Sequence, residues 1–443
     1  MSSPTDLPAI KLAQDAHLFL GDSANTRDCI GRVLPFWSEG TFGYSNVLGM
    51  HAFGLVETGA CTLAEEKADV ALALQSQDIW ALHAMVLVYQ MEARASEGCS
   101  FLSDCRDKWE DKPGPLRQHM AWHLGLFSLE RGQEIKAQRV YDTLLAPPRE
   151  GGRLAGPLRL PPPTPSALTD AGSLLWRMDI LGVDTGAHRW RGVAEAWVEY
   201  SHARHLSTLH DLHAVMAFAA MANGVEDDAE SDLWRSRAEE LLLSMRDYVH
   251  ASGGCRGAWE GRGSGSASEL SCDAEGSSRP TPLLSGRTEP TGRCDGNVHC
   301  CIARRGWGGG GGGGGMPLPP DNLWVAEHVG LSLCEAMVSY RQGNFEDAVS
   351  KLLPLRYHLD AIGGTRTQQD IVHVTLLDAA LRLPDQSIAK TLVCERRTQR
   401  PTSGRAWEAY GAVMEKEGNL EEAFAARRVS FEFGIGQGGV GAN

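Results

Sequence analysis

Apolar residues recur at intervals of three and four along most of the chain, which is the spacing that places them on one face of an α-helix. The segments LAEEKADVALAL, from Leu63, and EDAVSKLLPLRY, from Glu346, show this pattern and are rich in good helix formers. Alternating runs of β-branched and aromatic residues, which would indicate strands, are absent. The pattern therefore predicts an all-α protein.

Four segments repeat one template, in which a small residue is followed by a glycine seven positions later and an alanine five positions beyond that. A small residue lets two antiparallel helices approach closely, glycine adopts the left-handed conformation that ends the first helix, and alanine fits the crossing point. Each copy therefore predicts a helical hairpin, and a weaker fifth copy carries Ala217 and Gly224. The four copies are Ala52–Gly59–Ala64, Gly125–Gly132–Ala137, Ala336–Gly343–Ala348 and Gly411–Gly418–Ala423.

The hairpin template resembles the tetratricopeptide repeat, a unit of about 34 residues whose two helices stack into a superhelix. The order of longer segments, from VLPFWSEGTFGYSNVLGMHAFGLVETG to GLSLCEAMVSYRQGNFEDAVSKLLPLRYHLDAIGGTRTQQDIV, is similar to that of the tetratricopeptide repeat protein 38 family over about residues 15–250 and 321–430. The resemblance implies an all-α, tetratricopeptide-like helical-hairpin solenoid, an α-α superhelix, in the cytoplasm. It supplies no catalytic residues. It also implies that the late start and the glycine-rich insertion of this chain come from an imperfect gene model, a retained intron or a truncated isoform.

Glycine and proline divide the chain into folded and unfolded parts. Residues 251–320 hold 19 of the 50 glycines, including an unbroken run from Gly308 to Gly315, and have too little apolar area to offset the entropy lost on folding. The predicted organisation is a disordered N-terminus (1–8), a repeat block (9–250) with a Pro/Gly-rich loop (146–165), a disordered insertion (251–320), a second repeat block (321–433) and a disordered tail (434–443).

Composition narrows the class of protein further. The 443-residue chain has a net charge of −14, which argues against binding to nucleic acid, and it has no apolar stretch near the roughly 18 residues of a membrane span. Eleven scattered cysteines, an odd number, do not form a disulfide framework. These features predict a cytoplasmic protein with free thiols that binds neither nucleic acid nor membrane.

The repeat register predicts where a protein partner would bind. In a tetratricopeptide-type array the first helix of each hairpin lines the concave face. The Lys and Asn pattern that clamps a C-terminal carboxylate is not visible, so chaperone C-terminal peptides are not the favoured partner. Counting back from each turn glycine places eight residues in this groove: Asn46, Phe53, His119, Trp122, Leu126, Tyr340, Arg405 and Glu408.

Two groups of histidines suggest chemistry as the alternative. His119 and His123 are spaced i,i+4 on one helical face, as in zinc proteases, but Met120 occupies the position of the catalytic glutamate. A third ligand would have to come from His83 or His51. This pair supports an alternative function, a metal-dependent hydrolase or small-molecule-binding enzyme. The favoured interpretation is that these histidines line a groove or satisfy backbone groups.

The second group, His202, His205, His210 and His213, lies near Asp211 and Ser207, without the G-x-S-x-G elbow that would expose a serine nucleophile. We therefore predict structural roles for these histidines. The favoured function is a non-enzymatic scaffold for protein–protein interaction, with no catalytic residue, no metal and no cofactor.

Overall fold

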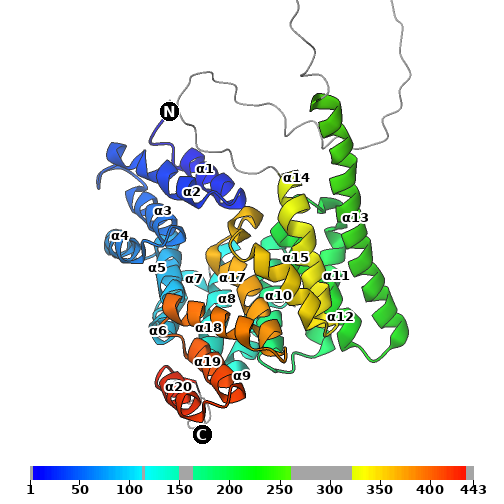
Figure 1. Ribbon diagram of the computed structural model, residues 1–443. Helices are drawn as coiled ribbons and strands as arrows, with labels where there is room; N and C mark the ends of the chain where they lie inside the picture. Colours follow the sequence, from blue (N-terminus) through cyan, green and yellow to red (C-terminus); the bar gives the residue numbers. More distant parts are fainter. Residues whose placement is uncertain (1–2, 112–114, 149–162, 261–321, 436–443) are drawn as a thin grey trace, which may run out of the picture. The chain divides into compact units, whose positions relative to one another are not determined.

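The computed structural model describes residues 3–111, 115–148, 163–260 and 322–435, and within these ranges the chain forms helices and no strand (Figure 1). The predicted all-α class is therefore confirmed for this part of the chain. A search of the same residues for a helix with the length and apolar character needed to traverse a bilayer gave none. The buried cysteines Cys29, Cys99, Cys105 and Cys334 are free thiols, as predicted.

The helices follow one another through short turns. Those of the first half are α1 (Leu7–Phe19), α2 (Ser23–Gly31), η1 (Leu34–Phe36), α3 (Tyr44–Glu57), α4 (Cys61–Leu74), α5 (Ile79–Met91), α6 (Ala95–Asp104), α7 (Arg106–Trp109), α8 (Pro115–Glu130), α9 (Glu134–Val140) and η2 (Tyr141–Leu145). They continue with α10 (Pro165–Ile180), α11 (Ala187–Glu199), η3 (Ser201–Ala203), α12 (Thr208–Gly224) and α13 (Asp228–Glu260). The last part contains α14 (Asn322–Val325), η5 (Ala326–Gly330), α15 (Leu331–Arg341), α16 (Phe345–Leu352), η6 (Leu353–Leu355), η7 (Leu359–Ile362), α17 (Arg366–Leu381), α18 (Ser387–Gln399), α19 (Gly404–Lys416) and α20 (Leu420–Glu432).

The four template glycines end the first helix of each hairpin as predicted. Gly59, Gly132, Gly343 and Gly418 all adopt positive φ, between 65° and 83°. In each case the residue after the glycine donates its backbone N–H to the carbonyl five residues before it, as Ala60 does to Leu55 (2.9 Å). This bond satisfies one of the carbonyls left free at the helix end. The hairpins are α3–α4, α8–α9, α15–α16 and α19–α20.

The small residues of the template lie where the paired helices cross. Ala52, Ala64, Ala137, Ala336 and Ala348 are fully buried. At the fourth hairpin, a Cβ on Gly411 would lie 3.3 Å from the carbonyl oxygen of Ala423, its template partner. The crossing helices are therefore as close as the template predicts.

The weaker fifth copy differs, because Gly224 is the last residue of α12 and is not among the glycines with positive φ. The α5–α6 turn has the same hydrogen bond as the four hairpins, from Arg94 N–H to the Tyr89 carbonyl (2.8 Å), but Ala93 supplies the positive φ of 55°. An alanine in this conformation costs about 1–2 kcal/mol. This hairpin therefore forms without the turn glycine of the template. The sequence predicts it as a weaker sixth copy, from Trp80 through Ala84 to Trp109.

The first helices of successive hairpins pack side by side in series, from α3 through α5, α8, α10, α12 and α15 to α17. The series then turns back, since α17 also packs on α10 and on α5 (Figure 1). The indole N–H of Trp176 on α10 donates to the Thr375 hydroxyl on α17 (2.9 Å), across 199 residues of sequence. Helix α17 therefore fills the inner side of the array.

The two predicted repeat blocks belong to one compact unit, which comprises residues 1–253 and 319–443. One large hydrophobic cluster of this unit contains residues from both blocks, from Ala52 to Ala426. Helix α1 begins at Leu7, within the predicted disordered N-terminus, and α13 continues to Glu260, into the predicted insertion. The remainder of that insertion, most of the 146–165 loop and most of the predicted tail lie outside the described residues.

Candidate functional site

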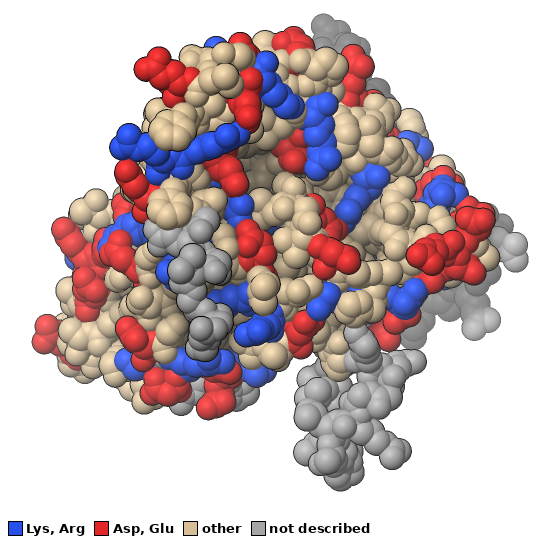
Figure 2. Space-filling model, turned by 90° about the horizontal axis from the view of Figure 1, so that it is seen from below, with Lys and Arg blue, Asp and Glu red and all other residues tan. Residues whose placement is uncertain are grey.

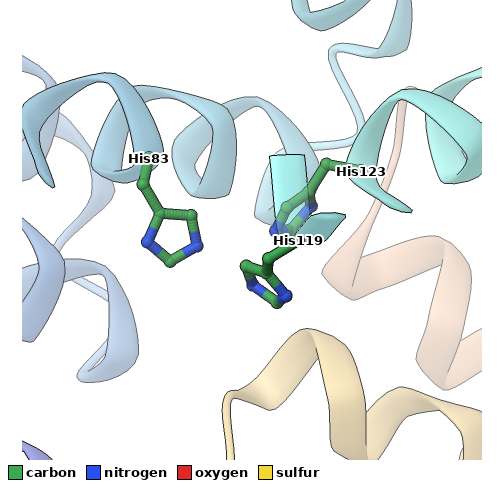
Figure 3. Close-up of side chains that lie close together, drawn as sticks. All are labelled: His83, His119 and His123. Carbon is green, nitrogen blue, oxygen red and sulfur yellow. The ribbon is translucent and has the colours of Figure 1, made fainter. Parts of the chain in front are cut away.

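Three histidines meet inside the compact unit (Figure 3). Helix α5 carries His83, and α8, which packs on α5, carries His119 and His123 one turn apart. All three side chains are buried, with exposed fractions of 5%, 9% and 0%. One ring nitrogen of each lies within 4.8 Å of one from each of the others. We call these residues the histidine cluster. The sequence offered His83 or His51 as a third member, and the structure selects His83.

A polar chain from two other helices holds His119. Its Nδ1–H donates to Oδ2 of Asp170 on α10 (2.8 Å), and Oδ1 of the same carboxylate accepts from the side-chain amide of Gln368 on α17 (3.1 Å). Gln368 is fixed in turn, because its side-chain oxygen accepts the backbone N–H of Thr365 in the box that caps α17. The ring of His119 is therefore held in one orientation by residues from three helices.

The other two members of the cluster have few polar contacts. Neither ring nitrogen of His123, nor Nε2 of His83, has a hydrogen-bond partner among the described residues. Burial holds the pKa of both imidazoles well below the usual histidine range, with smaller contributions from the neighbouring histidines. Both rings are therefore neutral at physiological pH, and each keeps an unprotonated nitrogen whose lone pair points into the protein.

Glu57, at the end of α3, places a carboxyl group near the same cluster. It is 2% exposed, and its Oε2 accepts the backbone N–H of Arg366, the first residue of α17 (3.0 Å). Burial raises the pKa of this carboxyl to about 7, although the hydrogen bond from Arg366 and the charge of His119 oppose the shift. Glu57 therefore titrates near neutral pH.

A Glu57→Gln variant tests this titration. The folded protein keeps a proton on Glu57 that the unfolded chain, with a pKa near 4.5, has released, so stability falls as pH rises from about 4.5 through 7. Between pH 5 and pH 8, the free energy of unfolding of the native chain should fall by about 2–3 kcal/mol more than that of Glu57→Gln. Urea unfolding of chelator-treated protein at each pH measures this difference. The exposed Glu421→Gln variant serves as the control. Parallel stability curves for the native chain and Glu57→Gln would contradict the assignment.

A charged cluster lies two helical turns along α10 from Asp170, around Arg177. The carboxylate of Asp370 on α17 accepts two hydrogen bonds from Arg396 (2.9 and 3.1 Å) and lies 3.6 Å from a guanidinium nitrogen of Arg400 and 4.0 Å from one of Arg177. Burial lowers the pKa of Arg177 to about 10, and the three guanidinium groups hold that of Asp370 well below its usual range. Arg177 also lies over the ring of Trp122, 5.8 Å from its centre. Nothing in the sequence pattern anticipated this cluster.

The structure separates the eight predicted groove residues into two sets. His119, Trp122, Leu126 and Tyr340 are each at most 9% exposed. The hydroxyl of Tyr340, for example, donates to Asp378 on α17 (2.5 Å). These four side chains are therefore buried by the chain's own helices and offer little surface to a partner. The other four retain some exposure: Asn46, Phe53, Arg405 and Glu408.

The second histidine group has a visible structural role. Asp211 accepts the backbone N–H of His205 through both carboxylate oxygens (3.0 and 3.2 Å), and His205 has a positive φ of 65°. Nδ1 of His213 is hydrogen-bonded to the Leu209 carbonyl (2.8 Å). The Asp211 carboxylate thus stabilises the strained turn before α12.

No protein-family model matches the chain. Among solved structures, yeast Tom70 aligns with 96% of this chain and 76% of its own, at 10% identity and a TM-score of 0.24. The Naa15/Naa10 complex bound to HypK-THB aligns with 96% of this chain and 63% of that chain, at 11% identity and a TM-score of 0.22. These values are too low to carry an argument, so the fold assignment rests on the hairpins themselves.

Proposed function

We propose that this chain is a non-enzymatic helical-repeat scaffold of the tetratricopeptide type, related to tetratricopeptide repeat protein 38, that binds another protein in the cytoplasm. The order of its sequence segments and the repeated hairpins support the relationship. Because the inner side of the array is filled by α17, the proposed binding surface is the exposed end of the array. The observation that carries this proposal is the apolar surface of α20.

Helix α20 packs on α19 through its small residues, since Ala423, Ala426 and Ser430 are buried. On an adjacent face, Leu420 and Phe424 are each 67% exposed, one helical turn apart. Within the array, the second helix of a hairpin is covered by the helix that follows, as α17 packs on α16. An amphipathic helix of a partner protein would pack on α20 in the same way.

Charge gives little selectivity on the face shown in Figure 2, where basic and acidic side chains are interspersed. Of the remaining groove residues, Arg405 is already engaged, because its guanidinium pairs with Glu134 and Glu408. The apolar pair Leu420 and Phe424 therefore offers the larger gain in binding free energy.

A double variant, Leu420→Glu with Phe424→Glu, tests the proposal. Two anchor residues worth about 2 kcal/mol each, about 4 kcal/mol together, predict a loss of affinity of roughly 700-fold. Such a loss would remove the partner from quantitative co-purification with the tagged protein. The matched control is Ile135→Glu with Leu243→Glu, since these exposed apolar side chains lie apart on α9 and α13. If both variants keep the native set of partners while remaining helical, α20 is not the binding surface.

A further inference from the structure

The histidine cluster is more tightly grouped than a chance packing of three buried rings requires. The ring centres of His83 and His119 are 4.9 Å apart, those of His119 and His123 4.8 Å, and those of His83 and His123 5.6 Å. The two α8 histidines are one turn apart, and α5 presents the third from the side, as Figure 3 shows. Three imidazoles thus surround one point inside the protein.

Packing alone does not satisfy the polar atoms of these rings. A neutral imidazole carries one N–H donor and one acceptor nitrogen, and buried groups of this kind nearly always have partners. His123 is 0% exposed, and neither of its nitrogens has a partner among the described residues. Nε2 of His83 is in the same state. A metal ion would accept the lone pair of one such nitrogen from each ring.

His119 has the surroundings of a metal ligand. Histidines that bind metals usually donate their second ring N–H to a carboxylate, which orients the ring and makes the ligand nitrogen more basic. The Nδ1–H of His119 donates to Asp170 in this manner, and the amide of Gln368 holds the carboxylate from its other side. Nε2 of His119 is then the ring nitrogen that remains available as a ligand.

We propose that His83, His119 and His123 together bind one zinc ion. Three neutral imidazole nitrogens are a ligand set that zinc accepts, with the fourth tetrahedral position taken by water. Zn–N bonds of about 2.0–2.1 Å place ligand nitrogens roughly 3.4 Å apart. The three ring nitrogens lie within 4.8 Å of one another. Side-chain rotations that move each nitrogen by about 1 Å would bring them to the spacing that zinc needs.

Three protein ligands and a water are the composition of catalytic zinc sites. The burial of the three ligands nevertheless favours a structural role for the ion here. A hydrolase needs a path for its substrate, whereas the three side chains here are at most 9% exposed. The ion would join α5 to α8 directly, and through Asp170 and Gln368 it would fix α10 and α17 against them. Zinc binding would therefore stabilise the return of α17 to the inner side of the array.

The test compares His123→Leu with His213→Leu in the full chain. Both histidines are 0% exposed and each has an unpartnered ring nitrogen, but His213 lies on α12, outside the cluster. After chelator treatment and re-equilibration with zinc, we expect one ion per native or His213→Leu chain by elemental analysis, and a melting temperature several degrees above that of the metal-free protein. We expect His123→Leu to lose both the ion and the shift, while its metal-free form remains folded.

An Asp170→Asn variant provides a second test. We expect it to bind zinc 10–100-fold more weakly than the native chain, as measured by competition with a chelating dye. Cobalt substitution reports the coordination sphere, because tetrahedral nitrogen ligation gives intense visible absorption that His123→Leu should lack. A native chain that takes up no zinc, or zinc that His123→Leu retains, would overturn the proposal. Both results leave the binding surface on α20 untested, so the two proposals fail independently.

Discussion

Replacing Asp370 by asparagine is expected to lower the free energy of unfolding by about 3–5 kcal/mol, the cost of leaving buried charges without their partner. Arg396, Arg400 and Arg177 share this carboxylate, and their side chains are at most 16% exposed. Without it, three guanidinium groups would repel one another in a poorly solvated environment. Urea unfolding at pH 7 measures the loss.

An exposed ion pair provides the control for Asp370. Asp232 pairs with Arg235, and the two side chains are 71% and 49% exposed. An Asp232→Asn variant should change stability by less than about 1 kcal/mol, since solvent screens such pairs. Equal losses in the two variants would mean that the charged cluster around Asp370 is solvated and contributes little.

The second large effect is expected at Gly21, where the turn between α1 and α2 approaches the segment before α17. A Cβ at this position would lie 1.8 Å from the carbonyl oxygen of Asp360, and the reciprocal glycine, Gly363, lies against the carbonyl of Phe19. Gly21 also has a φ of +70°. We expect Gly21→Ala to cost about 2–5 kcal/mol, the sum of backbone strain and overpacking.

Gly343→Ala separates these two terms, because Gly343 has a φ of +77° but a Cβ there would meet no atom within 4 Å. It should lose only the strain, about 1–2 kcal/mol by thermal or urea unfolding. If Gly21→Ala is no more destabilising than Gly343→Ala, the close contact between the α1–α2 turn and the segment before α17 does not contribute to stability.

The local part of this fold could be predicted because its determinants are local. A glycine such as Gly132 ends a helix through its own φ and the hydrogen bonds of its own turn, so a fixed spacing in the sequence is sufficient evidence. The return of α17 depends instead on contacts such as Arg366 with Glu57, which are 309 residues apart. No periodicity records such a contact, so the register placed Trp122 on an inner surface and could not show that the surface is covered.

The candidate site was visible in part for the same reason. The spacing of His119 and His123 reveals two neighbours on one helical face, whereas His83 could be offered only as one of two possibilities. Asp170 was missed, although a carboxylate within the apolar helix ALTDAGSLLW is itself a signal of a buried partner. The charged cluster could not be predicted from the sequence, because Asp370, Arg396 and Arg177 come from three helices with ordinary polar patterns.

Helix α17 packs both on its neighbours in the series and on the earlier helices α5 and α10, and this changes how the array is stabilised. In an open repeat protein each unit depends only on its neighbours, so units can be lost from an end one at a time. A chain that stops before Arg366 has its earlier hairpins but lacks the hydrogen bonds that Arg366 donates to Glu57 and Gln368 donates to Asp170. Helix α17 therefore completes an interior that α3, α5 and α10 form only in part, and we expect these helices to unfold cooperatively.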